Sequence, residues 1–289
     1  MHTYTHELAL FIKTYRPDFV PFCRLLASIR QYNVDRIPVL ISVNNRDYHF
    51  FKRRLRLTDG IHLVRDQELC PYQIKDGWRY QQLVKMHFYK SGFARYYVSL
   101  DSDAFFIRDF HASDFVNQGV PYLIKHGSEE YIAALQAHQH DTDTLFFKES
   151  LRAVKTYFKS TDTALYDYGP SPYIWDAQVW RSLLETYILP ETPLTLFRHL
   201  DALYLPSENA LYGEYVNLTG HSHYRARGPL FWVYHFDFQY FSEPSLRMDD
   251  LIEKYRAQGY LGIIIQSNFF AFSKWDRLRM SWKALWNKV

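Results

Sequence analysis

The chain has 289 residues, of which 47% are hydrophobic and 22% are charged, and its formal net charge at pH 7 is +3. This composition excludes a disordered or collagen-like protein, and the charge is too small to indicate nucleic-acid binding. No run of about 18 apolar residues and no signal-peptide pattern is present, so we expect neither a membrane-spanning helix nor secretion. Cys23 and Cys70 predict free thiols in a reducing compartment.

The first third of the chain alternates short apolar runs with helical patterns. The apolar runs predict strands at residues 8–15, 37–43, 61–64 and 95–100. Helices are predicted at 19–32 and, after a polar turn at 44–47, at 48–56. Near-continuous apolar strands separated by helices indicate an α/β fold with a buried parallel sheet, which binds ligands beyond the carboxyl ends of its strands.

Residues 77–92 predict a helix with two distinct faces, ended by Gly92 as the C-cap. One face is apolar and is expected to pack on the core: Tyr80, Leu83, Val84, His87 and Phe88. The second face mixes aromatic, amide and basic side chains: Trp78, Gln81, Gln82, Lys85 and Tyr89. We expect this second face to lie beside a ligand.

The middle of the chain predicts helices at 129–138 and 144–159. The segment between them has the composition of a metal site, with His138, His140, Asp141 and Asp143, but we expect a solvated loop because nothing fixes its geometry. A loop rich in proline and aromatic residues at 166–175 leads to a helix that ends at Tyr187. Another helix is predicted to begin at 207–208.

The sharpest motif is Asp101-Ser102-Asp103, which directly follows the predicted fourth strand. In an extended chain, carboxylates two residues apart point to the same side. At the end of a buried strand, such a pair suits a hard divalent cation, which binds one or two carboxylates together with substrate phosphates. The cation would neutralise the charge that develops on a departing diphosphate. The alternative is a solvated turn, but the apolar residues on both sides of the motif argue against it.

The strand that ends in Leu-Asp-Ser-Asp, with the preceding helix that carries Gly77-Trp78, Gln81-Gln82 and Lys85, resembles GT-A glycosyltransferases. The resemblance covers residues 8–125 well. The helix pattern itself is similar to that of an uncharacterised bacterial branch of the superfamily. It implies a GT-A, Rossmann-like fold with a mixed, mostly parallel central sheet flanked by helices. It also implies that Asp101 lies near the ribose and a Mn²⁺ or Mg²⁺ ion, and that Asp103 ligates this metal.

The resemblance further implies a nucleotide pocket built from the ends of the early strands. It assigns residues to three parts of that pocket: Thr14, Tyr15, Arg16 and Asp18 along its wall, Asn44 and Asn45 at the base or ribose, and Lys85 or Arg79 against the phosphates. For Lys85, an ordinary surface lysine is the alternative. The resemblance also implies a third metal ligand from the C-terminal part: His221, His223 or His235. We favour His235, because its aromatic strand ends near an acidic residue as the motif strand does, although a structural histidine is the alternative for each.

An inverting transferase needs a carboxylate as general base, and a retaining one needs a different arrangement at the anomeric carbon. Asp176 follows a loop suited to stacking on an acceptor sugar, but it also fits a helix N-cap. Glu208 is ranked level with it, and its alternative is a first-turn acid favoured by the helix dipole. Glu214 ranks behind both.

The C-terminal residues 271–289 predict a basic amphipathic helix. One stripe is apolar and rich in tryptophan: Trp275, Leu278, Trp282, Leu285, Trp286 and Val289. Such a helix suits an anionic membrane surface, and docking on the rest of the chain is the alternative. We therefore divide the chain into a glycosyltransferase domain at 1–270, with a nucleotide-sugar half at 1–125 and an acceptor half at 126–270, and this tail.

Together these patterns predict a metal-dependent glycosyltransferase that moves a sugar from a nucleotide-diphosphate donor to a saccharide or lipid-linked saccharide acceptor. We expect it to act in cell-surface glycan synthesis (lipopolysaccharide, O-antigen or capsule), in the cytoplasm at the inner face of the membrane, with no nucleic-acid partner. The alternatives are a nucleotidyltransferase with a similar sheet and a non-catalytic membrane-surface or glycan-binding protein. Motifs of common dehydrogenases, P-loop enzymes, zincins and serine hydrolases are absent from the sequence.

Overall fold

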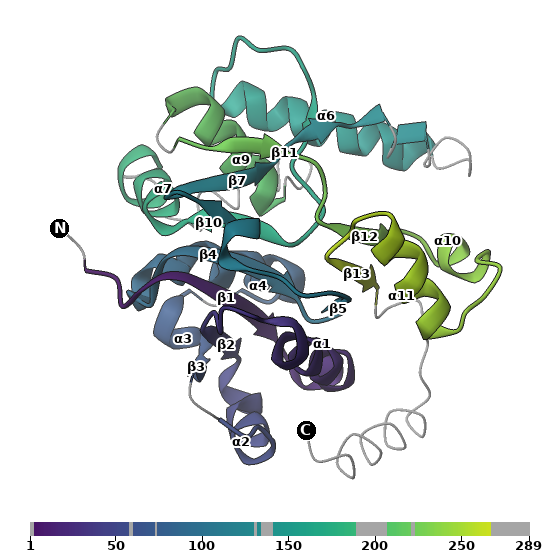
Figure 1. The fold of residues 1–289 in the computed structure, drawn as a ribbon. Coiled ribbons are helices and arrows are strands. Elements are labelled where there is room, and N and C mark those ends of the chain that lie inside the picture. Colours follow the sequence, from purple (N-terminus) through teal and green to yellow (C-terminus); the bar gives the residue numbers. More distant parts are fainter. Residues whose placement is uncertain are drawn as a thin grey trace.

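A computed structural model of the chain describes most of its residues: 3–57, 60–72, 74–129, 132–133, 141–188, 207–220 and 223–266. Its centre is a five-stranded sheet in the order β10-β4-β1-β2-β3 (Figure 1). Four strands are parallel: β1 (His6–Thr14), β2 (Val39–Val43), β3 (Ile61–Arg65) and β4 (Ala94–Asp101). The fifth, β10 (Tyr173–Asp176), pairs with β4 in the antiparallel sense.

Helices cover both faces of this sheet, because successive side chains of each strand point to opposite sides. Leu10 and Ile12 of β1 pack in a core with α1 (Phe19–Tyr32) and α2 (Asn45–Arg54). Ala9 and Phe11 pack in a second core with α4 (Gly77–Met86), α7 (Ala177–Ser182) and α9 (Glu208–Thr219). The fold is therefore the predicted Rossmann-like α/β arrangement, with a mostly parallel sheet between helical layers.

Three smaller sheets complete the described part of the chain. The first joins β12 (Phe231–Tyr234), β13 (Gly262–Ile265) and β5 (Ala104–Phe106), and it is packed with α10 (Asp237–Phe241) and α11 (Met248–Ala257). The others are β11 (Arg225–Arg227) with β7 (Val120–Ile124) and β6 (Val116–Asn117), and β8 (His126–Gly127) with β9 (Tyr166–Asp167). Remaining helical elements are α3 (Asp66–Leu69), α6 (Asp141–Tyr157), a π-helix at Leu183–Tyr187, and 3₁₀ turns at Arg16–Asp18, His87–Ser91 and Ala112–Asp114.

Several helix boundaries differ from the sequence prediction. The helix α2 begins at Asn45 rather than at 48, because the Asn44 side chain caps it by accepting a hydrogen bond from the Asp47 backbone N–H. The helix α6 is already helical at Asp141, the first described residue of this segment, three residues before the predicted start at 144. The predicted helix at 77–92 is α-helical to Met86 and continues as a 3₁₀ turn, which the left-handed Gly92 ends as predicted.

Some predictions concern residues that the structure does not describe. These are most of the helix predicted at 129–138, His138 and His140 of the segment with the composition of a metal site, His221, and the whole C-terminal tail at 271–289. Among the described residues, no helix combines the length and the apolar composition that crossing a lipid bilayer requires.

Candidate functional site

The topology of the central sheet predicts a ligand site beyond the carboxyl ends of β1 and β4. On one side of β1 the chain continues to β2 and β3, and on the other side lies β4, so the strand order reverses at this point. Ligands of open α/β sheets bind beyond the carboxyl ends of the strands where the order reverses. A cleft of about 570 Å³ lies there, bordered by Tyr15 after β1 and by Asp101 at the end of β4. This volume is within the usual range for small-molecule sites.

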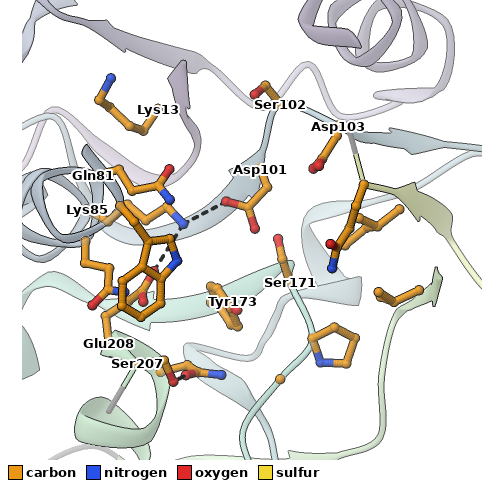
Figure 2. Close-up of a pocket in the computed structure, with 18 of the residues that line it drawn as sticks. Lys13, Gln81, Lys85, Asp101, Ser102, Asp103, Ser171, Tyr173, Ser207 and Glu208 are labelled. Atoms are coloured by element: carbon orange, nitrogen blue, oxygen red, sulfur yellow. Dashed lines mark hydrogen bonds and ion pairs between the residues drawn. The ribbon is translucent and has the colours of Figure 1, made fainter. Parts of the chain in front are cut away.

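A buried cation at the centre of the cleft joins two carboxylates from different elements. The Lys85 ammonium of α4 lies 2.7 Å from Oδ1 of Asp101 and 3.1 Å from Oε1 of Glu208, the first residue of α9 (Figure 2). Lys85 and Glu208 are buried, and the Asp101 side chain keeps 34% of its exposure. Burial acts to lower the pKa of Lys85, but the attraction of the two carboxylates outweighs it and raises that pKa, so the lysine stays charged.

The strand pattern explains why these groups meet. Tyr97 and Asp101 lie an even number of residues apart on β4, so both point to the face of the sheet that α4 covers. The Tyr97 hydroxyl donates a hydrogen bond of 2.9 Å to the backbone oxygen of Lys85, which ties α4 to β4. The predicted second face of this helix therefore does border the cleft, through Trp78, Gln81, Gln82 and Lys85, whereas Tyr89 belongs to the core.

The second motif carboxylate and one of the predicted histidines come together through the sheet of β12, β13 and β5. In its register Ala104 pairs with Ile264, and the next residue of β13, Ile265, pairs with Tyr234. This brings Asp103, which precedes β5, and His235, which follows β12, to the same end of the sheet, where both line the cleft. Burial lowers the pKa of His235, which favours its neutral imidazole.

The described cleft residues include side chains of types that can bind a divalent cation, but they are not gathered into a metal site. Asp101, Asp103 and His235 all border the same cleft. In the described part of the chain, no three histidine, cysteine or acidic side chains stand close enough to hold a metal by themselves. Magnesium and manganese sites of nucleotide enzymes commonly have one or two carboxylates, with the remaining ligands taken from phosphates and water.

The predicted nucleotide-pocket residues divide into two groups. Tyr15 and Asp18 border the cleft, as Lys85 and Asp101 do. Asp18 accepts a hydrogen bond of 3.0 Å from the hydroxyl of Ser102, which links the end of β1 to the motif loop. These four residues, Tyr15, Asp18, Lys85 and Asp101, thus come together where β1 and β4 end.

Three of the predicted residues, Thr14, Arg16 and Asn44, are not among the residues that border this cleft. Thr14 is buried, and the guanidinium of Arg16 lies 4.8 Å from the ring centre of Phe50. The Asn44 side chain is used as the cap of α2. Two other predicted residues also lie outside the border of the cleft: Asn45, on the first turn of α2, and Arg79, which is buried.

Of the predicted catalytic carboxylates, only Glu208 lies in the cleft. Asp176 pairs with Tyr96 of β4, five residues before Asp101, which separates them by roughly 16 Å along the strand. The Asp176 side chain caps α7 by accepting a hydrogen bond from the Gln178 backbone N–H. Asp176 therefore acts as a helix N-cap, which was the alternative given for it, and it does not border the cleft.

Two further candidates also lie outside the cleft. Glu214 is buried and forms an ion pair of 3.1 Å with Lys155, and it accepts a hydrogen bond from the Tyr168 hydroxyl. His223 does not border the cleft, so His235 is the one described histidine of the three candidates that does.

The sequence analysis missed Lys13, which borders the cleft from the end of β1. Its ammonium points away from Asp101 (Figure 2) and lies 3.2 Å from Oδ2 of Asp66, whose other carboxylate oxygen accepts a 2.6 Å hydrogen bond from Ser42. Burial lowers the pKa of Lys13 and raises that of Asp66. The sequence does contain a signal for such a pair, which is a lysine within an otherwise apolar strand. A buried lysine nearly always has a partner, so this position predicts a nearby acidic side chain.

The comparisons with known proteins give a matching family and many similar solved structures. The model of a family of unknown function, DUF6492, matches residues 8–225. An apo structure of the bifunctional glycosyltransferase WbbM is similar over 97% of this chain, with 10% sequence identity and a TM-score of 0.49. The match spans 52% of that chain, about half its length. No curated protein matches the sequence.

Proposed function

The chain belongs to the DUF6492 family, and we propose that it is a glycosyltransferase that moves a sugar from a nucleotide-diphosphate donor to a saccharide acceptor. One observation carries this proposal: Asp101 and Asp103 border the same cleft as the buried Lys85 and Glu208, beyond the carboxyl end of β4. The resemblance of the motif strand and of the helix before it to GT-A enzymes points to the same chemistry.

In the proposed reaction Asp101 and Asp103 would hold a Mn²⁺ or Mg²⁺ ion together with phosphate oxygens of the donor, with His235 as a candidate further ligand, and this ion would neutralise charge on the diphosphate leaving group. Tyr15 and Asp18 contact the nucleoside. Lys85 keeps the carboxylates of Asp101 and Glu208 in a fixed orientation across the cleft. Glu208 accepts the proton of the acceptor hydroxyl as that oxygen bonds to the anomeric carbon and the bond from this carbon to the diphosphate oxygen breaks, which releases the nucleoside diphosphate.

The cellular setting is part of the same proposal. A saccharide acceptor on a lipid carrier would be met at the inner face of the cell membrane, during synthesis of a cell-surface glycan. The basic, tryptophan-rich segment at 271–289 would hold the enzyme on that anionic surface. Residues 1–125 would bind the nucleotide sugar, and residues 126–270 the acceptor.

The proposal is tested by measuring release of nucleoside diphosphate from a panel of nucleotide sugars, with Mn²⁺ and a mixture of saccharide acceptors. We expect one donor to be consumed by the wild type and not by the Asp103→Asn variant. The matched control is Asp109→Asn, which changes an exposed carboxylate just beyond β5. Release of pyrophosphate from a nucleoside triphosphate and a sugar phosphate, in place of the diphosphate, would contradict the proposal and indicate a nucleotidyltransferase.

A further inference from the structure

The face of α4 that borders the cleft forms a continuous wall of side chains that differ in burial. Lys85 is buried at the carboxylates, Gln81 and Gln82 lie about one turn away from it, and Trp78 lies one further turn out. Figure 2 shows Gln81 and Lys85 extending from this helix toward Asp101. The proposed chemistry uses Lys85 and leaves the other three residues unexplained.

Gln82 combines burial, a position at the cleft and an amide group without hydrogen-bond partners among the described residues. Its side chain is buried, with 1% exposure, and it borders the cleft. Within the described part of the chain, neither its amide nitrogen nor its amide oxygen has a hydrogen-bond partner. Buried amides are nearly always paired, so an amide left without partners at the wall of a site indicates that a ligand supplies them.

Trp78 presents an aromatic surface at the outer end of the wall. The residue is 45% exposed, and the guanidinium of the buried Arg79 lies 5.0 Å from the centre of its ring. The side chain of Asp76 accepts hydrogen bonds from the backbone N–H groups of Trp78 and Arg79, which fixes the first turn of α4. The indole is thus held in place while a large part of it stays open to a ligand.

The chemistry of this wall matches a saccharide. A primary amide offers one acceptor and two donor positions side by side, and neighbouring sugar hydroxyls both donate and accept hydrogen bonds. The apolar face of a sugar ring packs on an indole. Tyr15 and Asp18, the residues assigned to the nucleoside, lead into α1 on the opposite face of the sheet from α4. Because the nucleoside is assigned to the side of α1, the wall on α4 is the place where we expect the saccharide to bind.

We propose that this wall binds an acceptor of at least two sugar rings, with one ring at Gln82 and the next on Trp78. The inference rests on the proposed function, because it makes this saccharide the acceptor. Lys85 and Trp78 are seven residues apart, which is a rise of about 10 Å along the helix and comparable to the length of a disaccharide. The ring at Gln82 then places its hydroxyl beside Glu208, the proposed base, which Lys85 contacts.

The test is binding of the labelled full-length protein to an array of mono-, di- and oligosaccharides. The variants are Trp78→Ala and Gln82→Leu, with Trp78→Phe as the conservative replacement and Phe241→Ala as a control. Phe241 is 53% exposed and lies on α10 outside the cleft. We expect the wild type to bind some disaccharides or longer chains but not their single rings. Trp78→Ala and Gln82→Leu should each bind roughly tenfold more weakly, whereas Trp78→Phe and Phe241→Ala should retain binding.

Binding of no saccharide by the wild type, or equal binding by the wild type and Trp78→Ala, would overturn the inference. Each variant is first checked for cooperative unfolding in urea, so that a lost fold is not mistaken for a lost contact. Titration of the same proteins with nucleoside diphosphate and Mn²⁺ separates the two proposals. Nucleotide binding without saccharide binding overturns only the inference, and saccharide binding without nucleotide binding overturns the proposed function while supporting the wall as a saccharide site.

Discussion

Replacing Lys85 with methionine tests the electrostatic centre of the cleft. The methionine keeps the apolar length of the side chain but removes the charge that lies 2.7 Å from Asp101 and 3.1 Å from Glu208. The backbone oxygen of residue 85 still accepts the hydrogen bond from the Tyr97 hydroxyl, so the helix stays tied to β4. The variant therefore leaves two carboxylates facing each other without a cation between them.

The expected loss of stability follows from the burial of the three groups. Breaking a buried ion pair by removing one partner costs about 3–5 kcal/mol, because the other charge stays buried and unpaired. The Glu208 side chain is only 6% exposed and bears this cost in full, whereas Asp101, at 34% exposure, is partly solvated. We therefore expect Lys85→Met to lower the free energy of unfolding at pH 7 by about 3 kcal/mol, at the lower end of that range.

The assay is urea unfolding followed by tryptophan fluorescence and circular dichroism. The double variant Lys85→Met/Glu208→Gln removes the unpaired buried charge and should recover about 2 kcal/mol relative to Lys85→Met. Lys90→Met, an exposed lysine on the following 3₁₀ turn, is the control and should change stability by less than about 0.5 kcal/mol. A loss below about 1 kcal/mol for Lys85→Met, or no recovery in the double variant, would refute the reasoning.

Three further predictions concern the elements around the cleft. Burial lowers the pKa of His87 from 6.5 to about 4, so the unfolded chain binds more protons between these values. The wild type should lose about 1.4 kcal/mol of stability per unit as pH falls through this window, and the urea midpoint of His87→Gln should depend less on pH. Asp76→Ala removes the cap of α4 and should cost about 1 kcal/mol in the same unfolding assay, with weaker saccharide binding if α4 forms the acceptor wall. Asp176→Ala removes the cap of α7 and should lower the free energy of unfolding by at least about 1 kcal/mol. It should leave the nucleotide affinity measured by calorimetry unchanged, and a loss of affinity would show that Asp176 belongs to the site.

Local sequence patterns were enough to predict the main strands and the motif at the end of β4. Apolar runs mark buried strands because parallel sheets are covered on both faces, and β1 to β4 lie where these runs occur. The two-faced pattern of α4 predicted a helix face beside a ligand, and the structure places that face along the cleft. Both features depend on residues close together in the chain.

Features that depend on distant residues could not be predicted in this way. Asp176 and Glu208 both look like polar residues at the start of a helix, and only the register of β10 against β4 separates them. Asn44 follows the end of a strand, as a ligand-binding residue would, but the next helix begins earlier than expected and uses its side chain as a cap. The pair of Lys13 and Asp66 joins residues on β1 and α3 that no local pattern connects.

The most direct test of the central claim is calorimetric titration with a panel of nucleoside diphosphates, with and without Mn²⁺, for the wild type and Asp103→Ala. The account predicts that one nucleotide binds to the wild type only when Mn²⁺ is present, and that Asp103→Ala loses this binding while it unfolds as cooperatively as the wild type. Binding of no nucleotide, or equal binding by the variant, would contradict the claim that the strand-end carboxylates hold a metal for a nucleotide-sugar donor.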